Sequence, residues 1–76
     1  MNPLEQLRAN VRDTPPAPPA LEAYLDKVRR HAYRVTDADV AALKDAGLGE
    51  DEIFEQTVAA AIGEGLRRLD AAEAVL

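Results

Sequence analysis

The sequence predicts an all-α fold, a small bundle of about four helices that oligomerisation completes. Apolar residues recur at helical spacing through most of the 76 residues, and the stretch from Val35 to Glu55 has the pattern of a helix, a sharp turn and a second helix. A chain of this length buries only about 60% of the surface that its unfolded form exposes. Small domains usually need disulfides, a metal or a partner, and this chain contains no cysteine. We therefore expect a partner chain.

Residues 1–19 are expected to form a short helix followed by a stiff arm. Asn2 is placed to cap this helix, and Pro3 suits its first position. Its apolar stripe is Leu4, Leu7 and Val11. Four prolines among residues 15–19 then favour an extended segment. Two interpretations stay open for this arm: it packs on another subunit, or it is a frayed N-terminus.

A helical domain is predicted over residues 20–76, and its first helix should run from about Pro19 to Arg34. Acidic residues precede basic ones along this helix, an order that suits the helix dipole. Its apolar face should contain Leu21, Tyr24, Leu25, Val28, Ala32 and Val35.

The next helix has clear start and stop signals. Thr36 is a good N-cap, and Asp39 three residues on completes an approximate capping box. Gly47 fits the left-handed position after the helix, where a side chain would clash. Leu48 follows it and can contact Leu43, as a Schellman motif requires.

The last helix is expected to run from about Glu50 to near the C-terminus. Its apolar stripe is Phe54, Val58, Ala61, Ile62, Gly65, Leu69, Ala72 and Leu76, widened by Ala59, Gly63 and Leu66. Each glycine within it costs about 1 kcal/mol against alanine, which is best explained if another helix crosses closely there. The predicted oligomer interface is Phe54, Val58, Ile62, Gly63, Gly65, Leu66 and Leu69.

Composition argues against several classes of function. Without cysteine, the chain has no disulfide, thiolate metal site or redox thiol. The acidic start of the last helix lacks the loop spacing of an EF-hand, so we expect no metal and no cofactor. The N-terminus has no apolar core of a signal peptide, and no apolar run approaches the roughly 20 residues that span a bilayer. We expect a soluble cytoplasmic protein, and the Ala-, Arg- and Asp-rich composition suggests a bacterial source.

Catalysis has few candidates. His31 is the only histidine, and no serine or cysteine can act as its nucleophile. A site between subunits could be formed by His31, Tyr24, Glu64 and Arg68. Each of these residues also has a structural interpretation, as a residue at an interface or on a solvated helix face.

DNA binding is the other alternative, because helix-turn-helix is the shape of many repressor modules. The second helix of the pair would enter the groove with the acidic residues "EDEIFE", whereas phosphate contact needs Lys or Arg. Residues 36–57 carry one basic and seven acidic side chains, and residues 1–35 carry six basic and four acidic ones. This asymmetry could let one copy dock on another, or could be an ordinary solvated surface.

Four short motifs follow one another in a characteristic order: Val35-Thr36-Asp37, Ala46-Gly47-Leu48, Asp51-Glu52-Ile53 and Arg68-Leu69. In this order they resemble the C-terminal half of proteins in the carboxymuconolactone decarboxylase and alkylhydroperoxidase-D-like family. The match covers about residues 20–74. The resemblance implies an all-helical fold that assembles as dimers or higher homo-oligomers, often hexamers. It also implies a Cys-x-x-Cys active site on an upstream helix, which this chain lacks.

The favoured prediction is therefore a non-catalytic structural or interaction protein that retains the scaffold half of this fold. Its partner would be itself, in a dimer or higher homo-oligomer, or an unidentified protein that it serves as a small accessory subunit. The first alternative is a carboxymuconolactone decarboxylase-like enzyme with its site at a subunit interface. The second is a helix-turn-helix protein that binds nucleic acid.

Overall fold

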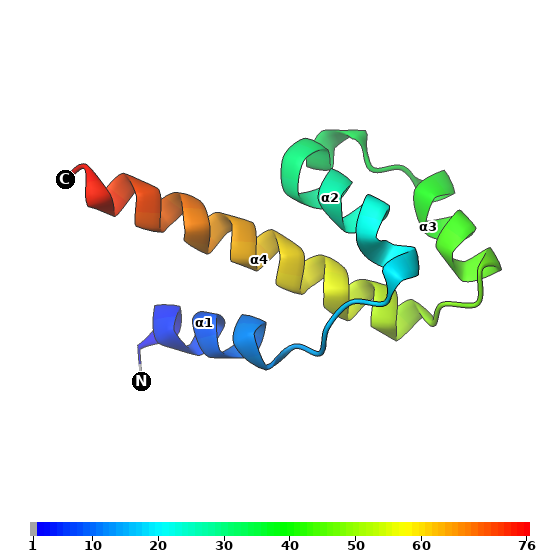
Figure 1. Ribbon diagram of the computed structural model, residues 1–76, viewed down its shortest axis with the longest axis horizontal. Helices are drawn as coiled ribbons and strands as arrows, with labels where there is room; N and C mark the ends of the chain where they lie inside the picture. The colour runs from blue at the N-terminus through cyan, green and yellow to red at the C-terminus, as the bar shows by residue number, and fades with distance from the viewer. Residues whose placement is uncertain (1) are drawn as a thin grey trace.

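The computed structural model describes residues 2–76, and all regular structure in that range is helical (Figure 1). The predicted all-α class is therefore confirmed. The α-helices and the two short 3-10 turns, η1 and η2, follow one another as α1 (Pro3–Asp13), η1 (Pro19–Leu21), α2 (Glu22–His31), η2 (Ala32–Arg34), α3 (Asp37–Asp45) and α4 (Glu50–Ala74).

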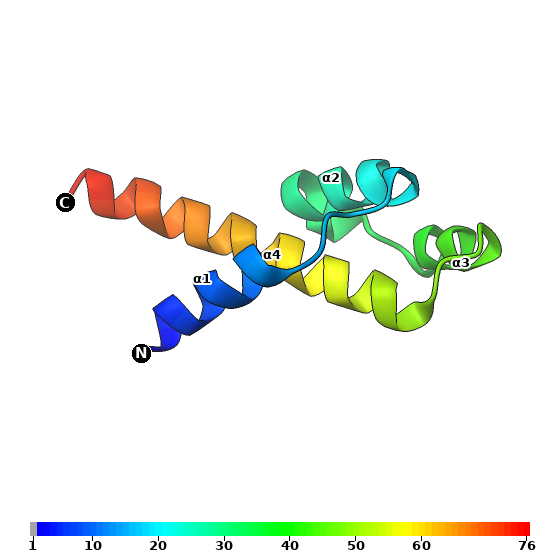
Figure 2. The ribbon, with the colours of Figure 1, turned by 60° about the horizontal axis from the view of Figure 1, so that its bottom comes forward.

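The long helix α4 is the element against which the others pack. It has 25 residues and extends along most of the molecule, which measures 44 × 25 × 18 Å. α2 and α3 lie against its N-terminal half, whereas α1 lies along its C-terminal half (Figures 1 and 2). The small helical bundle is thus arranged around a single central helix.

The hydrophobic core lies where α2, α3 and the first half of α4 meet. Leu21 and Leu25 are its most completely buried large side chains. Burial of each such side chain stabilises the fold by about 1.5–3 kcal/mol relative to an exposed position. The complete core cluster is Leu21, Tyr24, Leu25, Val28, Leu43, Ile53 and Ala60.

Both ends of α3 have the local structure that the sequence predicts. The Thr36 side chain accepts a hydrogen bond from the backbone N–H of Asp39, and the Asp39 carboxylate accepts one from the N–H of Thr36. At the other end, Gly47 has φ +95°. The N–H of Leu48 donates to the carbonyl of Leu43 at 3.2 Å, which is the long hydrogen bond of a Schellman motif.

The helix predicted from about Pro19 to Arg34 is found over these bounds, but both of its ends are 3-10 turns, η1 and η2, rather than α-helix. The α-helical path is interrupted at His31, where φ is −142° and ψ is 50°. The turn η2 follows because the chain must change direction before the extended N-cap Thr36. Ala32, which the periodicity places on the buried face, is therefore exposed.

An ion pair joins α2 to α3 and makes stability depend on pH. Lys27 Nζ lies 2.8 Å from a carboxylate oxygen of Asp39. This hydrogen bond, followed by the one from the backbone of Thr36, lowers the pKa of Asp39. Its stabilising effect is fully present above the unfolded-state pKa of about 3.9 and is lost as the pH falls through the folded-state pKa.

We therefore expect Asp39→Asn to lower the urea midpoint at pH 7 and to reduce its further fall between pH 5 and pH 2. Urea titrations at several pH values measure this. Lys27→Met removes the main hydrogen-bond donor to Asp39 and should also reduce the fall of the urea midpoint between pH 5 and pH 2. Asp70 and Glu64 also have lowered pKa values, so some acid dependence will persist. An unchanged pH profile in both variants would contradict the assignment.

Candidate functional site

Helix α4 has two apolar faces, and the other described elements cover one of them far more completely than the other. The covered face contains the buried residues Ile53, Gln56, Ala60 and Leu66. The opposite face, called here the outer face, follows the predicted apolar stripe. Its members are Phe54, Val58, Ala61, Ile62, Gly65, Leu69, Ala72 and Leu76.

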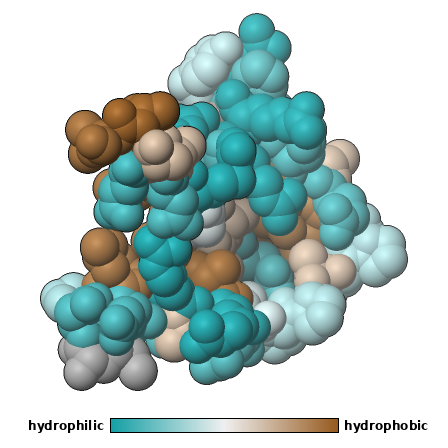
Figure 3. All heavy atoms as spheres, turned by 60° about the vertical axis from the view of Figure 1, so that its left-hand side comes forward, coloured by the Kyte–Doolittle hydropathy of each residue, from teal (hydrophilic) through white to brown (hydrophobic). Residues whose placement is uncertain are grey.

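Much of the outer face is open to solvent. Phe54 is 71% exposed and Val58 is 38% exposed. Ile62 and Leu69 are half-buried, while Ala61, Gly65 and Ala72 are exposed. Brown hydrophobic atoms also lie open among teal hydrophilic ones when the molecule is seen from the end where the C-terminus lies (Figure 3). No charged residue belongs to this stripe, although its members within α4, from Phe54 to Ala72, extend over about five turns of helix.

Five of the seven predicted interface residues belong to the outer face, and the other two do not. Leu66 is buried within the chain, and Gly63 faces α1, where an added Cβ would lie 3.5 Å from Val11 Cγ1. These two positions lie on the side of α4 that α1 covers. The close helix contact that the glycines indicate is thus made by α1 at Gly63, whereas nothing lies within 4 Å of a Cβ built on Gly65.

Two polar contacts hold α1 and the proline-rich arm against α4. Arg8 makes a bidentate pair with Asp70, at 2.7 and 3.0 Å. The Gln56 side-chain amide donates to the carbonyl of Pro15 at 2.8 Å. The first helix and its arm are therefore fixed on their own chain. Sequence reasoning missed Gln56, whose only signal is that a polar residue stands among the apolar residues of the covered face of α4.

A groove lies between the end of α1 and the first half of α4. Its volume is about 430 Å³. Phe54, Val58 and Ile62 line one wall, so the groove continues the outer face toward α1. The remaining lining residues are Asn10, Val11, Asp13, Thr14, Glu55 and Ala59.

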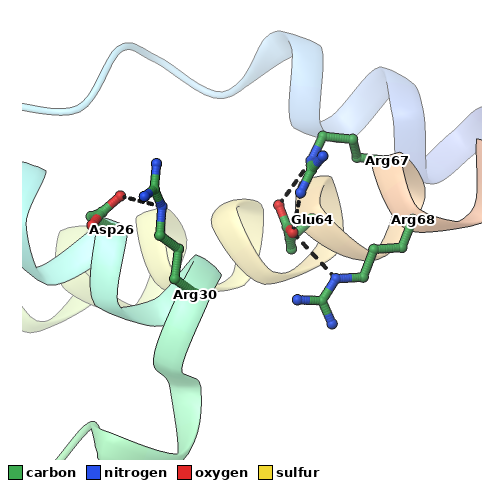
Figure 4. Close-up of polar contacts among 5 residues, drawn as sticks. All are labelled: Asp26, Arg30, Glu64, Arg67 and Arg68. Carbon is green, nitrogen blue, oxygen red and sulfur yellow. Dashed lines mark hydrogen bonds and ion pairs between the residues drawn. The ribbon is translucent and has the colours of Figure 1, made fainter. Parts of the chain in front are cut away.

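A second hollow of about 440 Å³ lies on the covered side, among α1, the arm, α2 and α4. Glu64 and Arg67 line it from α4, and Glu22 and Arg29 line it from α2. Arg67 and Arg68 both donate to the Glu64 carboxylate (Figure 4). The pKa of Glu64 is lowered, chiefly by the hydrogen bond from Arg67. Its carboxylate is thus held ionised by its own helix and is poorly suited to act as a general base at neutral pH.

The four catalytic candidates do not form one cluster within residues 2–76. Glu64 and Arg68 are paired, with 3.2 Å between Oε1 and Nε. The Tyr24 hydroxyl is hydrogen-bonded to Thr57 Oγ1 at 2.8 Å. His31 is exposed at the end of α2, where its ring meets the Tyr33 ring edge-on. The polar contacts of the described residues therefore do not connect His31 or Tyr24 to Glu64.

Two further features concern metals and membranes. Among residues 2–76, no three His, Asp or Glu side chains converge in a way that could hold a metal ion. Within the same range, none of the helices combines the length and the apolar character needed to cross a membrane.

Comparison with known proteins returns no match to a family model, to a curated protein or to a solved structure. The resemblance to the alkylhydroperoxidase-D-like family therefore stays a prediction from the sequence. The features of the structure that bear on function are the outer face of α4 and the groove that continues it.

Proposed function

We propose that this chain is a non-catalytic structural protein that assembles with copies of itself through the outer face of α4. The observation that carries the proposal is an apolar stripe, without a charged member, on the side of the central helix that the other described elements leave most open. Exposed apolar stripes of this kind on a folded chain mark interaction surfaces.

The exposed surface area supports the proposal, because its excess over the area expected for a monomer is close to the area that a partner would cover. The chain exposes 5472 Å². A folded monomer of 8.2 kDa is expected to expose about 4500 Å², so the excess is about 900 Å². A stable protein interface buries about 800 Å² on each partner. The excess surface therefore matches one side of a standard interface.

The shape supports the same proposal. The radius of gyration is 13.7 Å, whereas a compact domain of 76 residues is expected to have one of about 11 Å. The elongation comes from α4, whose C-terminal end extends beyond the elements that pack on it (Figure 1). A second copy along the outer face would turn this extended arrangement into a thicker bundle with a shared core.

The assembly should also fit the family resemblance, which implies a homo-oligomeric scaffold. We carry over only this part, because the Cys-x-x-Cys pair of the peroxidase branch is absent. The helix-turn-helix alternative gains no support from the structure. The first turn of α4 is formed by Glu50, Asp51 and Glu52, all exposed, and would repel phosphates.

The test is Val58→Glu, which places a charge in the middle of the exposed apolar stripe. We expect this variant to be monomeric by light scattering after gel filtration, because burial of an unpaired carboxylate opposes association. Its helical circular dichroism should match that of the unchanged chain, since Val58 lies outside the core.

Ala71→Glu is the matched control, because Ala71 is exposed on the same helix but does not belong to the outer face. This control should keep the mass of the unchanged chain. If Val58→Glu also keeps that mass, the outer face is not the assembly surface. A monomeric unchanged chain would overturn self-assembly and favour the accessory-subunit alternative.

A further inference from the structure

The apolar positions of the outer face are symmetric about Gly65. Counted from this glycine within α4, they stand at four and seven residues in both directions, whereas at eleven residues Phe54 lies in α4 and Leu76 lies beyond its last residue, Ala74. On the N-terminal side these positions are Ala61, Val58 and Phe54, and on the C-terminal side they are Leu69, Ala72 and Leu76. Ile62 is the one member of the outer face without such a counterpart.

This symmetry has a structural consequence for a pair of identical helices. A two-fold axis perpendicular to α4 at Gly65 relates the two sides of this glycine. A residue that precedes Gly65 by a given number of positions lies opposite the partner's residue that follows Gly65 by the same number. Each of these paired apolar residues would then face another apolar residue. Ala61 would face the partner's Leu69, and Val58 would face the partner's Ala72.

The sizes of the side chains fit a crossing at this axis. Gly65 has no side chain, and among residues 2–76 no atom apart from its chain neighbours and the nearby backbone of its own helix lies within 4 Å of its Cβ position. Two backbones can therefore approach each other most closely there. Phe54, the largest side chain of the outer face, stands eleven residues from Gly65, where crossing helices diverge and leave more room.

The charges favour this antiparallel arrangement over a parallel one. The first turn of α4 carries Glu50, Asp51 and Glu52, and Glu55 follows one turn later. Parallel helices would bring the two acidic segments of the copies side by side. Antiparallel helices separate them to opposite ends of the pair and align the helix dipoles favourably.

We infer that two copies of this chain pair through the outer faces of their α4 helices, antiparallel, about a two-fold axis at Gly65. This arrangement rests on the proposed function, because it requires that the outer face be the surface of self-assembly. It makes the assembly a closed dimer, since a two-fold interface uses the same surface on both copies.

Disulfide trapping tests the arrangement directly, because the natural chain contains no cysteine. Ala61→Cys and Leu69→Cys chains are refolded together under mild oxidation. We expect a disulfide between the two different chains, identified by mass spectrometry. Neither variant alone should form one efficiently, because equivalent residues lie eight positions apart along the antiparallel helices. That offset is about 12 Å, whereas a disulfide requires Cα atoms within about 7 Å.

Ala71→Cys, mixed with Ala61→Cys, is the control for chance oxidation and should give little mixed disulfide. A parallel pair would instead join Ala61→Cys to itself and Leu69→Cys to itself. That result, in a sample with the mass of a dimer, would overturn the antiparallel arrangement and leave self-assembly intact. A sample that has the mass of a monomer would overturn both.

Discussion

Leu25→Ala should destabilise the chain by about 2–5 kcal/mol, the range measured for leucine deletions in well-packed cores. Leu25 is 1% exposed and belongs to the core cluster where α2 meets α4. A chain of 76 residues has a total stability of about 4–11 kcal/mol. The substitution therefore removes a large part of the stability, and we expect a substantial fall in the urea midpoint.

Val75→Ala provides the control, because Val75 is 85% exposed and lies outside the outer face. This variant should change the free energy of unfolding by no more than about 0.5 kcal/mol. Urea unfolding followed by circular dichroism measures both variants at the same protein concentration, since association adds to apparent stability. Equal midpoints for the two variants would contradict the assigned core.

Gly65→Leu should have the largest effect on assembly and convert the dimer into a monomer. A leucine at this position would stand on the proposed axis and hold the two backbones apart. Within one copy the same side chain has open space and a better helix propensity than glycine. We therefore expect lower mass by light scattering without a loss of helical circular dichroism in the monomer.

Gly63→Ala is the matched comparison on the same helix. Its added methyl would lie 3.5 Å from Val11 Cγ1, an ordinary contact with α1 of the same chain. This variant should keep the dimer and gain as much as about 1 kcal/mol of stability from helix propensity. If Gly65→Leu leaves the oligomer mass unchanged, no helix crosses closely at Gly65.

The parts of the fold that depend on local chemistry could be predicted from the sequence. The Thr36 cap and the Gly47 turn depend on neighbouring residues, and both form as expected. The buried stripe of η1 and α2 over Leu21, Leu25 and Val28 is also confirmed, because a regular apolar spacing specifies one face of a helix.

The position of the first helix could not be predicted, because it depends on contacts between distant residues. Arg8 meets Asp70 across 62 positions, and Gln56 meets the Pro15 carbonyl across 41. No local pattern specifies either pair. These contacts place α1 on α4 of its own chain, whereas the sequence left an arm on another subunit and a frayed terminus as alternatives.

The sequence predicts the apolar stripe of α4, but it does not predict that this stripe is the exposed face of the helix. α4 is rich in alanine on several sides, so its periodicity cannot show which apolar face the rest of the chain will cover. The structure covers the face with Ile53 and Leu66 and leaves open the face with Phe54 and Val58. That choice depends on where α1 and α2 dock.

The most direct test of self-assembly is the solution mass of the unchanged chain, measured by light scattering over a range of concentrations. We predict a mass of two chains of 8.2 kDa each at high concentration, with dissociation to one chain on dilution. A mass of one chain at every concentration would contradict the proposal that the outer face of α4 joins two copies.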